Sequence, residues 1–317
     1  MAYLQLILGL PVLIGGAWLL VRGASSLAVR FGIPEIIVGL TIVAMGTSAP
    51  ELIVSLLSAF KGSTDLAVGN VVGSNIANIL LILGIAGLIK PLAMEKSIRL
   101  REIPFCLLAT LMMAVLANDT FFGAGTGAVL ARGDGLALLG FFAIYLYYLA
   151  AVAKSGDADS VEKVAPSGTL ASGLMVAAGI PALALGGQWL VNGASEIAVS
   201  LGMSQALVGL TIVAVGTSLP ELATSVMAAL KGNADIAVGN VVGSNIFNIL
   251  WILGATSAIK PVTYDTAMNS DVWFLAAITI LFFIFTFTGK RHKIDRPEAG
   301  LFLGLYLAYL MFIIVRG

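Results

Sequence analysis

The sequence reads VGLTIVAMGTSAPE at residues 38–51 and VGLTIVAVGTSLPE at residues 208–221. A shift of 170 residues places residues 36–91 on residues 206–261 without a gap, and 37 of these 56 positions are identical. Self-similarity of this length indicates two copies of one structural unit. The rest of the chain is expected to complete the two halves of the molecule that contain these copies.

The composition is that of an integral membrane protein. Hydrophobic residues make up 59% of the 317 positions, charged residues make up 11%, and the mean hydropathy is +1.03. A membrane-spanning helix needs about 20 mostly apolar residues, and long unbroken apolar runs do not fit the alternating pattern of a transmembrane β-barrel. Ten such runs are present, at residues 4–29, 35–60, 65–89, 102–118, 134–153, 168–199, 205–230, 235–259, 271–289 and 296–316.

The repeat and the ten runs together predict an inverted architecture. Each copy holds five spans, and because five is odd, the second copy must cross the membrane in the opposite direction. Inverted repeats with ion sites near the membrane midplane are common in transporters. We expect an all-α integral membrane protein with ten transmembrane helices. Residues 1–153 form the first five-helix repeat, residues 154–167 a linker, and residues 168–317 the second, inverted repeat.

The loop charges predict the orientation. With the N-terminus outside, twelve Lys and Arg residues fall in inside loops and four in outside loops, and basic residues are enriched on the cytoplasmic side of membrane proteins. We therefore expect a multi-pass protein of the cell membrane, with both termini extracytoplasmic and the linker cytoplasmic.

The composition excludes several classes of function. A formal net charge of zero gives no general basic surface for nucleic acid. Cys106 is the only cysteine and His292 the only histidine, so we expect no disulfide, no cysteine or zinc metal cluster and no histidine acid–base chemistry. The sequence indicates no enzyme, no cofactor and no obligate protein partner.

Two acidic residues lie in the middle of predicted spans. Glu51 and Glu221 each end the phrase GTSxPE, and a charge at the bilayer centre costs roughly 2.5–3.5 kcal/mol on insertion scales. Pro50 lacks an N–H, so the carbonyl of Gly46 loses its helical partner. In a membrane such a carbonyl must be buried in protein or line a wet or ion-filled cavity. The phrase thus supplies a carboxylate, two hydroxyls and free carbonyls, the hard oxygen ligands that Ca²⁺ and Na⁺ take.

A second phrase, GNVVGSNIxN, also occurs twice, at residues 69–78 and 239–248. Asn70, Ser74 and Asn78 are spaced four residues apart and so share one helix face. A polar stripe in an apolar span is expected to face a cavity or another helix. Ser74 and Asn78 are candidate ligands, whereas Asn70 and Asn75, with their copies, could equally bond between helices or bind a cation.

The two carboxylates set the charge of the predicted site. Their formal charge of −2 is balanced by one Ca²⁺ or by two Na⁺, and competition for one pair of glutamates gives the mutual exclusion that antiport requires. Additional Na⁺ would bind neutral oxygens, and transport would then move net charge. An empty pair is expected to take up protons, which makes H⁺ a candidate competitor.

The two doubled phrases resemble the α-repeats of the sodium/calcium exchangers, within the cation/calcium antiporter superfamily. The resemblance covers essentially the whole chain, without the regulatory domains of large eukaryotic members, and implies exchange of Na⁺ for Ca²⁺ by alternating access. It implies that broken helices 2, 3, 7 and 8 form a central ion site. The resemblance assigns the metal to Glu51, Glu221, Thr47 and Thr217, and completes the site with oxygens of Ser48, Ser218, Ala44, Ala214, Ser74, Ser244, Asn78 and Asn248.

The resemblance also implies that spans 1 and 6 slide over the other eight. The glycine pairs Gly15-Gly16 and Gly186-Gly187 would suit a close interface with those eight spans.

Two positions depart from some relatives. Potassium-dependent exchangers carry an Asp at the position of Asn78 or Asn248, so the two asparagines argue against K⁺ cotransport. Proton-coupled relatives tend to carry an additional acid in the second phrase, which this chain lacks. The sequence therefore favours K⁺-independent, electrogenic Na⁺/Ca²⁺ antiport. The alternatives are Ca²⁺/H⁺ antiport and, in a different class, a passive cation channel, which would conduct without a counter-ion.

Overall fold

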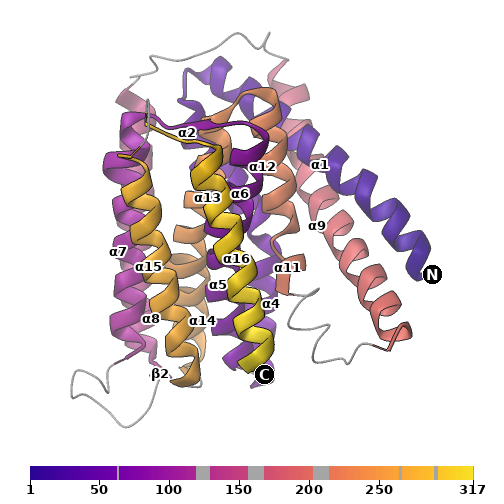
Figure 1. Cartoon of the computed structure of the whole chain (residues 1–317). Coiled ribbons are helices and arrows are strands. Elements are labelled where there is room, and N and C mark those ends of the chain that lie inside the picture. The colour runs from indigo at the N-terminus through magenta and orange to yellow at the C-terminus, as the bar shows by residue number, and fades with distance from the viewer. Residues whose placement is uncertain are drawn as a thin grey trace.

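The computed structural model describes residues 1–62, 64–118, 129–155, 168–202, 214–263, 266–288 and 292–316. They form a bundle of helices with two short two-stranded sheets (Figure 1). Most of the predicted linker, and the start of the predicted span at 205–230, lie outside these ranges. The described helices outside the repeated phrases are α1 (Ala2–Phe31), η3 (Ile98–Glu102), α7 (Ile103–Leu116), α8 (Arg132–Ser155), α9 (Thr169–Ser200), η7 (Thr266–Met268), α15 (Asn269–Phe285) and α16 (Arg296–Arg316).

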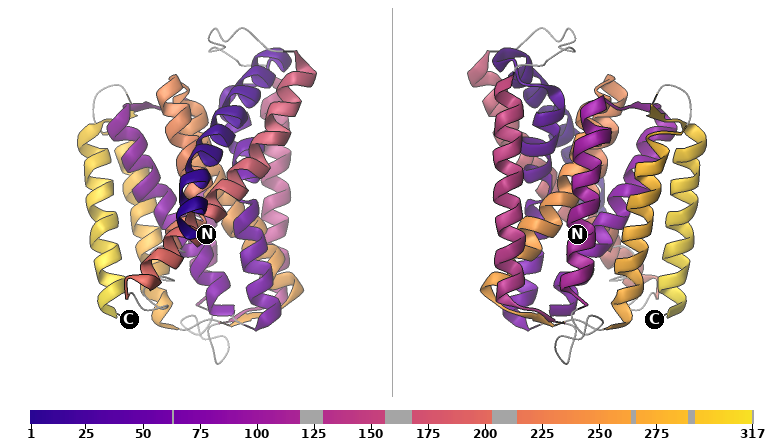
Figure 2. Two further views of the ribbon diagram at one scale, coloured as in Figure 1. Left: turned by 90° about the vertical axis from the view of Figure 1, so that its right-hand side faces the viewer. Right: turned by 90° about the vertical axis from the view of Figure 1, so that its left-hand side faces the viewer.

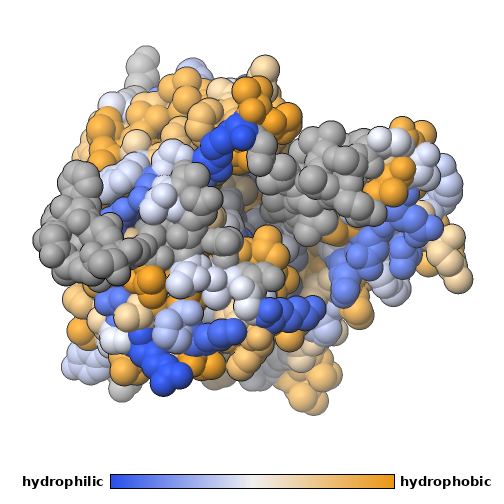
Figure 3. Space-filling view, turned by 90° about the horizontal axis from the view of Figure 1, so that it is seen from below, coloured by the Kyte–Doolittle hydropathy of each residue, from blue (hydrophilic) through white to orange (hydrophobic). Residues whose placement is uncertain are grey.

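The protein is an all-α membrane protein, as predicted. In the described part, six helices are long and apolar enough to cross a membrane, and one bent pair of helices would make a seventh span. Large apolar side chains are exposed on the outer faces of many helices, as the lipid requires. Figure 3 looks along the bundle from its lower end. Hydrophilic side chains cross this end face, and hydrophobic side chains gather along its edge.

The first repeated phrase forms a helix that breaks at its serine. In the first half the helix is α2 (Glu35–Val38), η1 (Gly39–Val43) and α3 (Ala44–Thr47), and it resumes as α4 (Ala49–Lys61) at an angle of 45°. In the second half α11 (Ala214–Gly216) is followed by α12 (Leu219–Lys231). Ser48 has φ −84° and ψ 6°, and Ser218 has φ −87° and ψ 6°. The two breaks have nearly the same geometry because a proline follows each serine by two residues and cannot donate a helical hydrogen bond.

The second repeated phrase forms helices that are continuous, which corrects the expectation that spans 3 and 8 are broken. One consists of α5 (Thr64–Ala77), η2 (Asn78–Ile82) and α6 (Leu83–Ile89). The other consists of α13 (Ala234–Ile246), η6 (Phe247–Leu253) and α14 (Gly254–Ile259). Neither contains a proline, so every residue keeps its N–H. The irregularity is instead a π-helical stretch, a feature that is frequent at functional sites.

The two small sheets join connecting segments at opposite ends of the bundle. Strand β1 (Leu92–Ala93) pairs with β4 (Lys293–Ile294), and β2 (Val129–Leu130) pairs with β3 (Val262–Thr263). In Figure 1, β2 lies at the lower end of the bundle, and the strand that leads into α16 lies at the upper end. Strands β1 and β3 correspond under the 170-residue shift, so equivalent segments of the two halves occupy opposite ends.

Helices α1 and α9 run antiparallel and side by side, slanting across the rest of the bundle (Figure 2). A Cβ atom added at Gly16 would lie 2.7 Å from the backbone nitrogen of Leu183, and one at Gly186 would lie 2.5 Å from that of Leu13. These glycines therefore hold the two helices together, which differs from the expected interface with the other spans. Gly15 faces open space, and only Gly187 approaches another helix, at Pro220 of α12.

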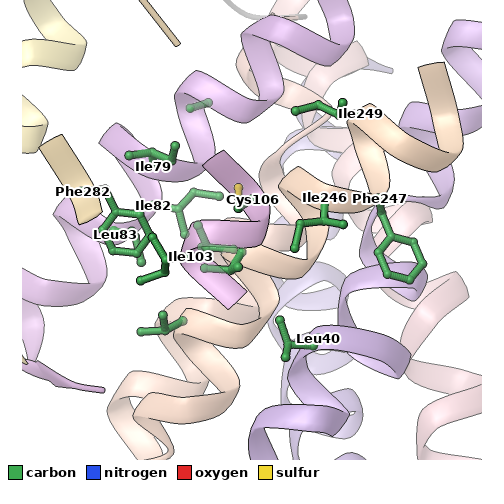
Figure 4. Close-up of a cluster of buried hydrophobic side chains, with 14 of the residues drawn as sticks. Leu40, Ile79, Ile82, Leu83, Ile103, Cys106, Ile246, Phe247, Ile249 and Phe282 are labelled. Carbon is green, nitrogen blue, oxygen red and sulfur yellow. The ribbon is translucent and has the colours of Figure 1, made fainter. Parts of the chain in front are cut away.

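The central helices α5–α6 and α13–α14 form the most buried part of the molecule. Figure 4 shows a cluster of buried apolar side chains that includes residues of η1, η2, α6, α7, α13, η6 and α15. Cys106 is buried in this cluster as a free thiol, next to Ile103 and Ile246. The two polar phrases are thus enclosed by buried apolar side chains.

Candidate cation site

Glu51 and Glu221 lie in the first turns of the helices that follow the two breaks, and both are buried at 1% exposure. Their carboxylates lie close enough for the two charges to interact. The hydroxyl of Ser48 donates to Oε1 of Glu221 at 3.1 Å, which links the break in one half to the carboxylate of the other. The fold therefore brings together the carboxylates of Glu51 and Glu221, which are 170 residues apart in the chain.

The second phrase supplies neutral oxygens. Ser74, Ser244, Asn78 and Asn248 lie on the two central helices, and all are buried at 2% exposure or less. Asn78 and Asn248 begin or lie within the π-helical stretches η2 and η6. The polar stripe predicted from the sequence is thus turned inward.

Eight buried side-chain oxygens of these phrases accept no hydrogen bond from any described residue. A buried oxygen without a donor costs free energy, and native proteins contain few such atoms. Eight of them together, carboxylate, hydroxyl and amide, match the ligands of a hard cation. They are Oε1 and Oε2 of Glu51, Oε2 of Glu221, the hydroxyls of Ser74, Ser218 and Ser244, and Oδ1 of Asn78 and Asn248.

The formal charge at these oxygens comes from the two glutamates. Among the described residues there is no cluster of three or more His, Cys, Asp or Glu side chains. A salt-bridge role is not supported either, because neither Glu51 nor Glu221 forms an ion pair with a described residue, whereas Lys293 pairs with Asp295 and Arg316 with Asp271.

The threonines and alanines of the predicted site are placed differently from the other residues. The Thr47 hydroxyl donates to Oδ1 of Asn240 at 3.1 Å and to the carbonyl of Ala44 at 3.2 Å. The Ala44 carbonyl also accepts the N–H of Ser48. Thr217 donates to Asn70 at 3.5 Å. The hydrogens of these hydroxyls are thus committed, and their lone pairs are what could face a cation. Ala214 begins α11, and its side chain lies outside the described part.

Four asparagines emerge as the framework of the site. Asn70 donates to the carbonyl of Glu51 at 3.3 Å and to Ser55 at 3.1 Å, and Asn240 makes the equivalent bonds to Glu221 and Ser225 at 3.3 and 2.9 Å. The sequence left this role and direct cation binding open. Asn75 and Asn245 bond to one another's helices. Their exact doubling in the sequence was the available signal, but the repeat cannot say which helix each one meets.

The fold and this oxygen-lined centre define a class of membrane transporter built from a helical bundle around a buried, doubly acidic site. The sequence pattern of the family described as Sodium/calcium exchanger protein matches residues 1–151 and 171–315. The chain is 39% identical over 317 residues to the protein CaxA of Alkalimonas amylolytica, covering 97% of each chain. It is 30% identical over 342 residues to the sodium/calcium exchanger MaX1 of Methanosarcina acetivorans, covering 98% of this chain and 97% of MaX1.

A solved structure has the same fold. The sodium-calcium exchanger NCX_Mj, soaked with Na⁺ and Sr²⁺, superimposes with a TM-score of 0.83 at 32% identity, over 98% of this chain and 97% of NCX_Mj. The chain belongs to the sodium/calcium exchanger family. It is therefore placed among the cation/calcium antiporters, which are membrane transporters and not enzymes.

Proposed function

We propose that this protein exchanges Na⁺ for Ca²⁺ across the cell membrane by alternating access, at a single site made by Glu51 and Glu221. The observation that carries this proposal is the set of eight buried oxygens that accept no hydrogen bond from the described protein. The relatives MaX1 and NCX_Mj, both named as sodium/calcium exchangers, support the choice of ions. Ca²⁺ and Na⁺ are then the transported ions, and no cofactor takes part.

The roles of the residues follow from their chemistry. Glu51 and Glu221 supply the formal charge of −2, which one Ca²⁺ or two Na⁺ neutralise. Ser48, Ser218, Ser74, Ser244, Asn78 and Asn248 supply neutral oxygens, and Thr47, Thr217, Ala44 and Ala214 supply hydroxyl or carbonyl oxygens at the breaks. Any Na⁺ beyond two binds these neutral groups, which makes the exchange electrogenic. Because both ions need the same glutamates, they exclude one another.

We propose further that the helices form ten spans in two inverted five-helix repeats, with both termini outside. The opposite placement of the equivalent strands β1 and β3 supports the inversion. The antiparallel contact between α1 and α9, which are the first helices of the two halves, supports it as well. This contact also suits the two helices to move as one body during alternating access.

Reconstitution into proteoliposomes tests the proposed exchange. Vesicles loaded with Na⁺ are expected to take up Ca²⁺ only when Na⁺ is absent outside, and a K⁺ gradient of the same size is expected to drive no uptake. Acidification is expected to reduce the flux, because protons compete for the glutamates. Uptake driven by a pH gradient and indifferent to Na⁺ would instead establish the alternative, Ca²⁺/H⁺ antiport. Ca²⁺ entry without any counter-ion would indicate a channel.

Substitution of Asn248 tests the role of the neutral amides. Asn248→Asp adds a third carboxylate beside the two glutamates and keeps the size of the side chain. We expect Ca²⁺ exchange to persist at a reduced rate, and to become sensitive to K⁺ or more sensitive to pH than in the wild type, because the added charge needs a further cation. Flux measured across a series of K⁺ concentrations and pH values, with the wild type in parallel, checks this. An identical K⁺ and pH response in the two proteins would place Asn248 outside the site.

A further inference from the structure

Four buried asparagines are joined by hydrogen bonds between the two halves of the molecule, in the order Asn78, Asn245, Asn75 and Asn248. Asn75 and Asn78 come from the first half, and Asn245 and Asn248 from the second. The Nδ2 of Asn75 donates to the backbone carbonyl of Asn245 at 3.2 Å, and the Nδ2 of Asn245 donates to the backbone carbonyl of Asn75 at 3.3 Å. We call these four residues the asparagine cluster.

The remaining two bonds of the asparagine cluster also cross between the halves. The Nδ2 of Asn78 donates to Oδ1 of Asn245 at 2.9 Å, and the Nδ2 of Asn248 donates to Oδ1 of Asn75 at 2.9 Å. Each candidate cation ligand is thus held by an asparagine from the opposite half, and not by its own neighbour three residues away. All four side chains are at 1% exposure or less.

The bonds within the asparagine cluster determine which end of each amide faces the candidate site. A backbone carbonyl can only accept, so the group of Asn75 that meets the Asn245 carbonyl must be its NH₂. Its Oδ1 then points to Asn248, which must answer with its own NH₂. The Oδ1 of Asn248 then takes no part in the bonds among the four asparagines, and it accepts no hydrogen bond from the described protein. The same argument fixes the Oδ1 of Asn78.

The helical backbone near the asparagine cluster departs from regular α geometry. The helices change from α to π geometry at Asn78 and at Phe247, just after Asn75 and Asn245. This change from i+4 to i+5 hydrogen bonding interrupts the regular ladder of the helix. Asn75 lies three residues and Asn245 two residues before the change, and the carbonyl of each accepts a side-chain amide from the other helix.

We propose that Asn75 and Asn245 are positioning residues that sustain cation affinity by holding Asn248 and Asn78 with their oxygens toward the site. The inference rests on the proposed cation site but assigns it two residues that touch no cation. Without Asn75, the NH₂ of Asn248 loses its acceptor and the amide can rotate. An NH₂ group turned into the site would repel a cation, since its hydrogens carry partial positive charge.

The test is equilibrium binding of ⁴⁵Ca²⁺ to the purified full-length protein, arranged as double-mutant cycles. Asn75→Ala is expected to weaken Ca²⁺ binding about tenfold, the size of one hydrogen bond near a charge. In an Asn248→Ala background the same substitution is expected to change the affinity less than about threefold. In an Asn78→Ala background it is expected to cost the full tenfold, because Asn75 does not orient Asn78.

The crossed pattern separates positioning from a general loss of structure. Asn118→Ala is the matched control, because Asn118 is a buried asparagine whose amide donates to a backbone carbonyl, that of Ala114, at 2.8 Å. It is expected to leave the Ca²⁺ affinity unchanged. If Asn75→Ala does not fold, the reciprocal cycle of Asn245 with Asn78 carries the same test. Equal effects of Asn75→Ala in both backgrounds would overturn the inference. A wild-type protein that binds no Ca²⁺ would instead overturn the proposed function.

Discussion

Replacing either buried glutamate by glutamine is expected to abolish Ca²⁺ exchange. Glu51→Gln and Glu221→Gln keep the shape of the side chain but remove one of the two formal charges at the site. At an effective dielectric constant of 20, unit charges 4 Å apart interact by roughly 4 kcal/mol, which corresponds to about a thousandfold in affinity. Na⁺-dependent ⁴⁵Ca²⁺ uptake into proteoliposomes measures the loss.

Although these substitutions are expected to abolish exchange, we expect them to stabilise the cation-free protein. Both oxygens of Glu51 are buried and accept no hydrogen bond from the described protein. A buried, unpaired charge is costly. Glu51→Gln is therefore expected to raise the melting temperature in the absence of cations and to remove the further increase that Ca²⁺ gives the wild type.

Glu196→Gln is the control for this experiment. It makes the same change at an exposed position of α9, and it is expected to alter neither exchange nor the Ca²⁺-dependent increase in melting temperature. Wild-type exchange in either Glu51→Gln or Glu221→Gln would eliminate the two-carboxylate mechanism.

Those local features that depend on backbone chemistry alone could be predicted from the sequence. Pro50 and Pro220 remove a helical donor wherever they stand, so the breaks at Ser48 and Ser218 follow without knowledge of the neighbours. The burial of Glu51 and Glu221 follows in the same way, because a carboxylate in the middle of an apolar span must face the interior. The central helices had no such determinant, and they proved to contain π-helical stretches instead of breaks.

Contacts between distant segments could not be predicted in this way. The helical period places Asn70, Ser74 and Asn78 on one face, but it does not say that the amide nitrogen of Asn78 donates to Asn245. Glu102 is a second example. It lies at the start of a predicted span, where a solvated charge is ordinary. In the structure it is fully buried and accepts hydrogen bonds from Ser97 and Tyr148, each at 2.8 Å.

The contact between α1 and α9 gives the second large effect that we expect. Gly16→Ala would place a Cβ atom 2.7 Å from the backbone nitrogen of Leu183 and 3.0 Å from the carbonyl of Gly179. Because the obstacles include backbone atoms, the helices must move apart, at a cost of about 1–3 kcal/mol. We expect a lower melting temperature and a loss of most Na⁺-dependent Ca²⁺ uptake, since α1 and α9 would no longer pack as one body.

The adjacent residue provides the matched control. Gly15→Ala adds the same methyl group to the same helix, but no atom beyond the adjoining backbone of α1 lies within 4 Å of its Cβ position, so it is expected to leave stability and uptake unchanged. A further variant separates backbone contact from side-chain packing. Leu183→Ala in the Gly16→Ala protein removes a side chain but not the backbone nitrogen, and it is expected to restore nothing. Full uptake in Gly16→Ala, or its rescue by Leu183→Ala, would show that close backbone approach is not what joins the two helices.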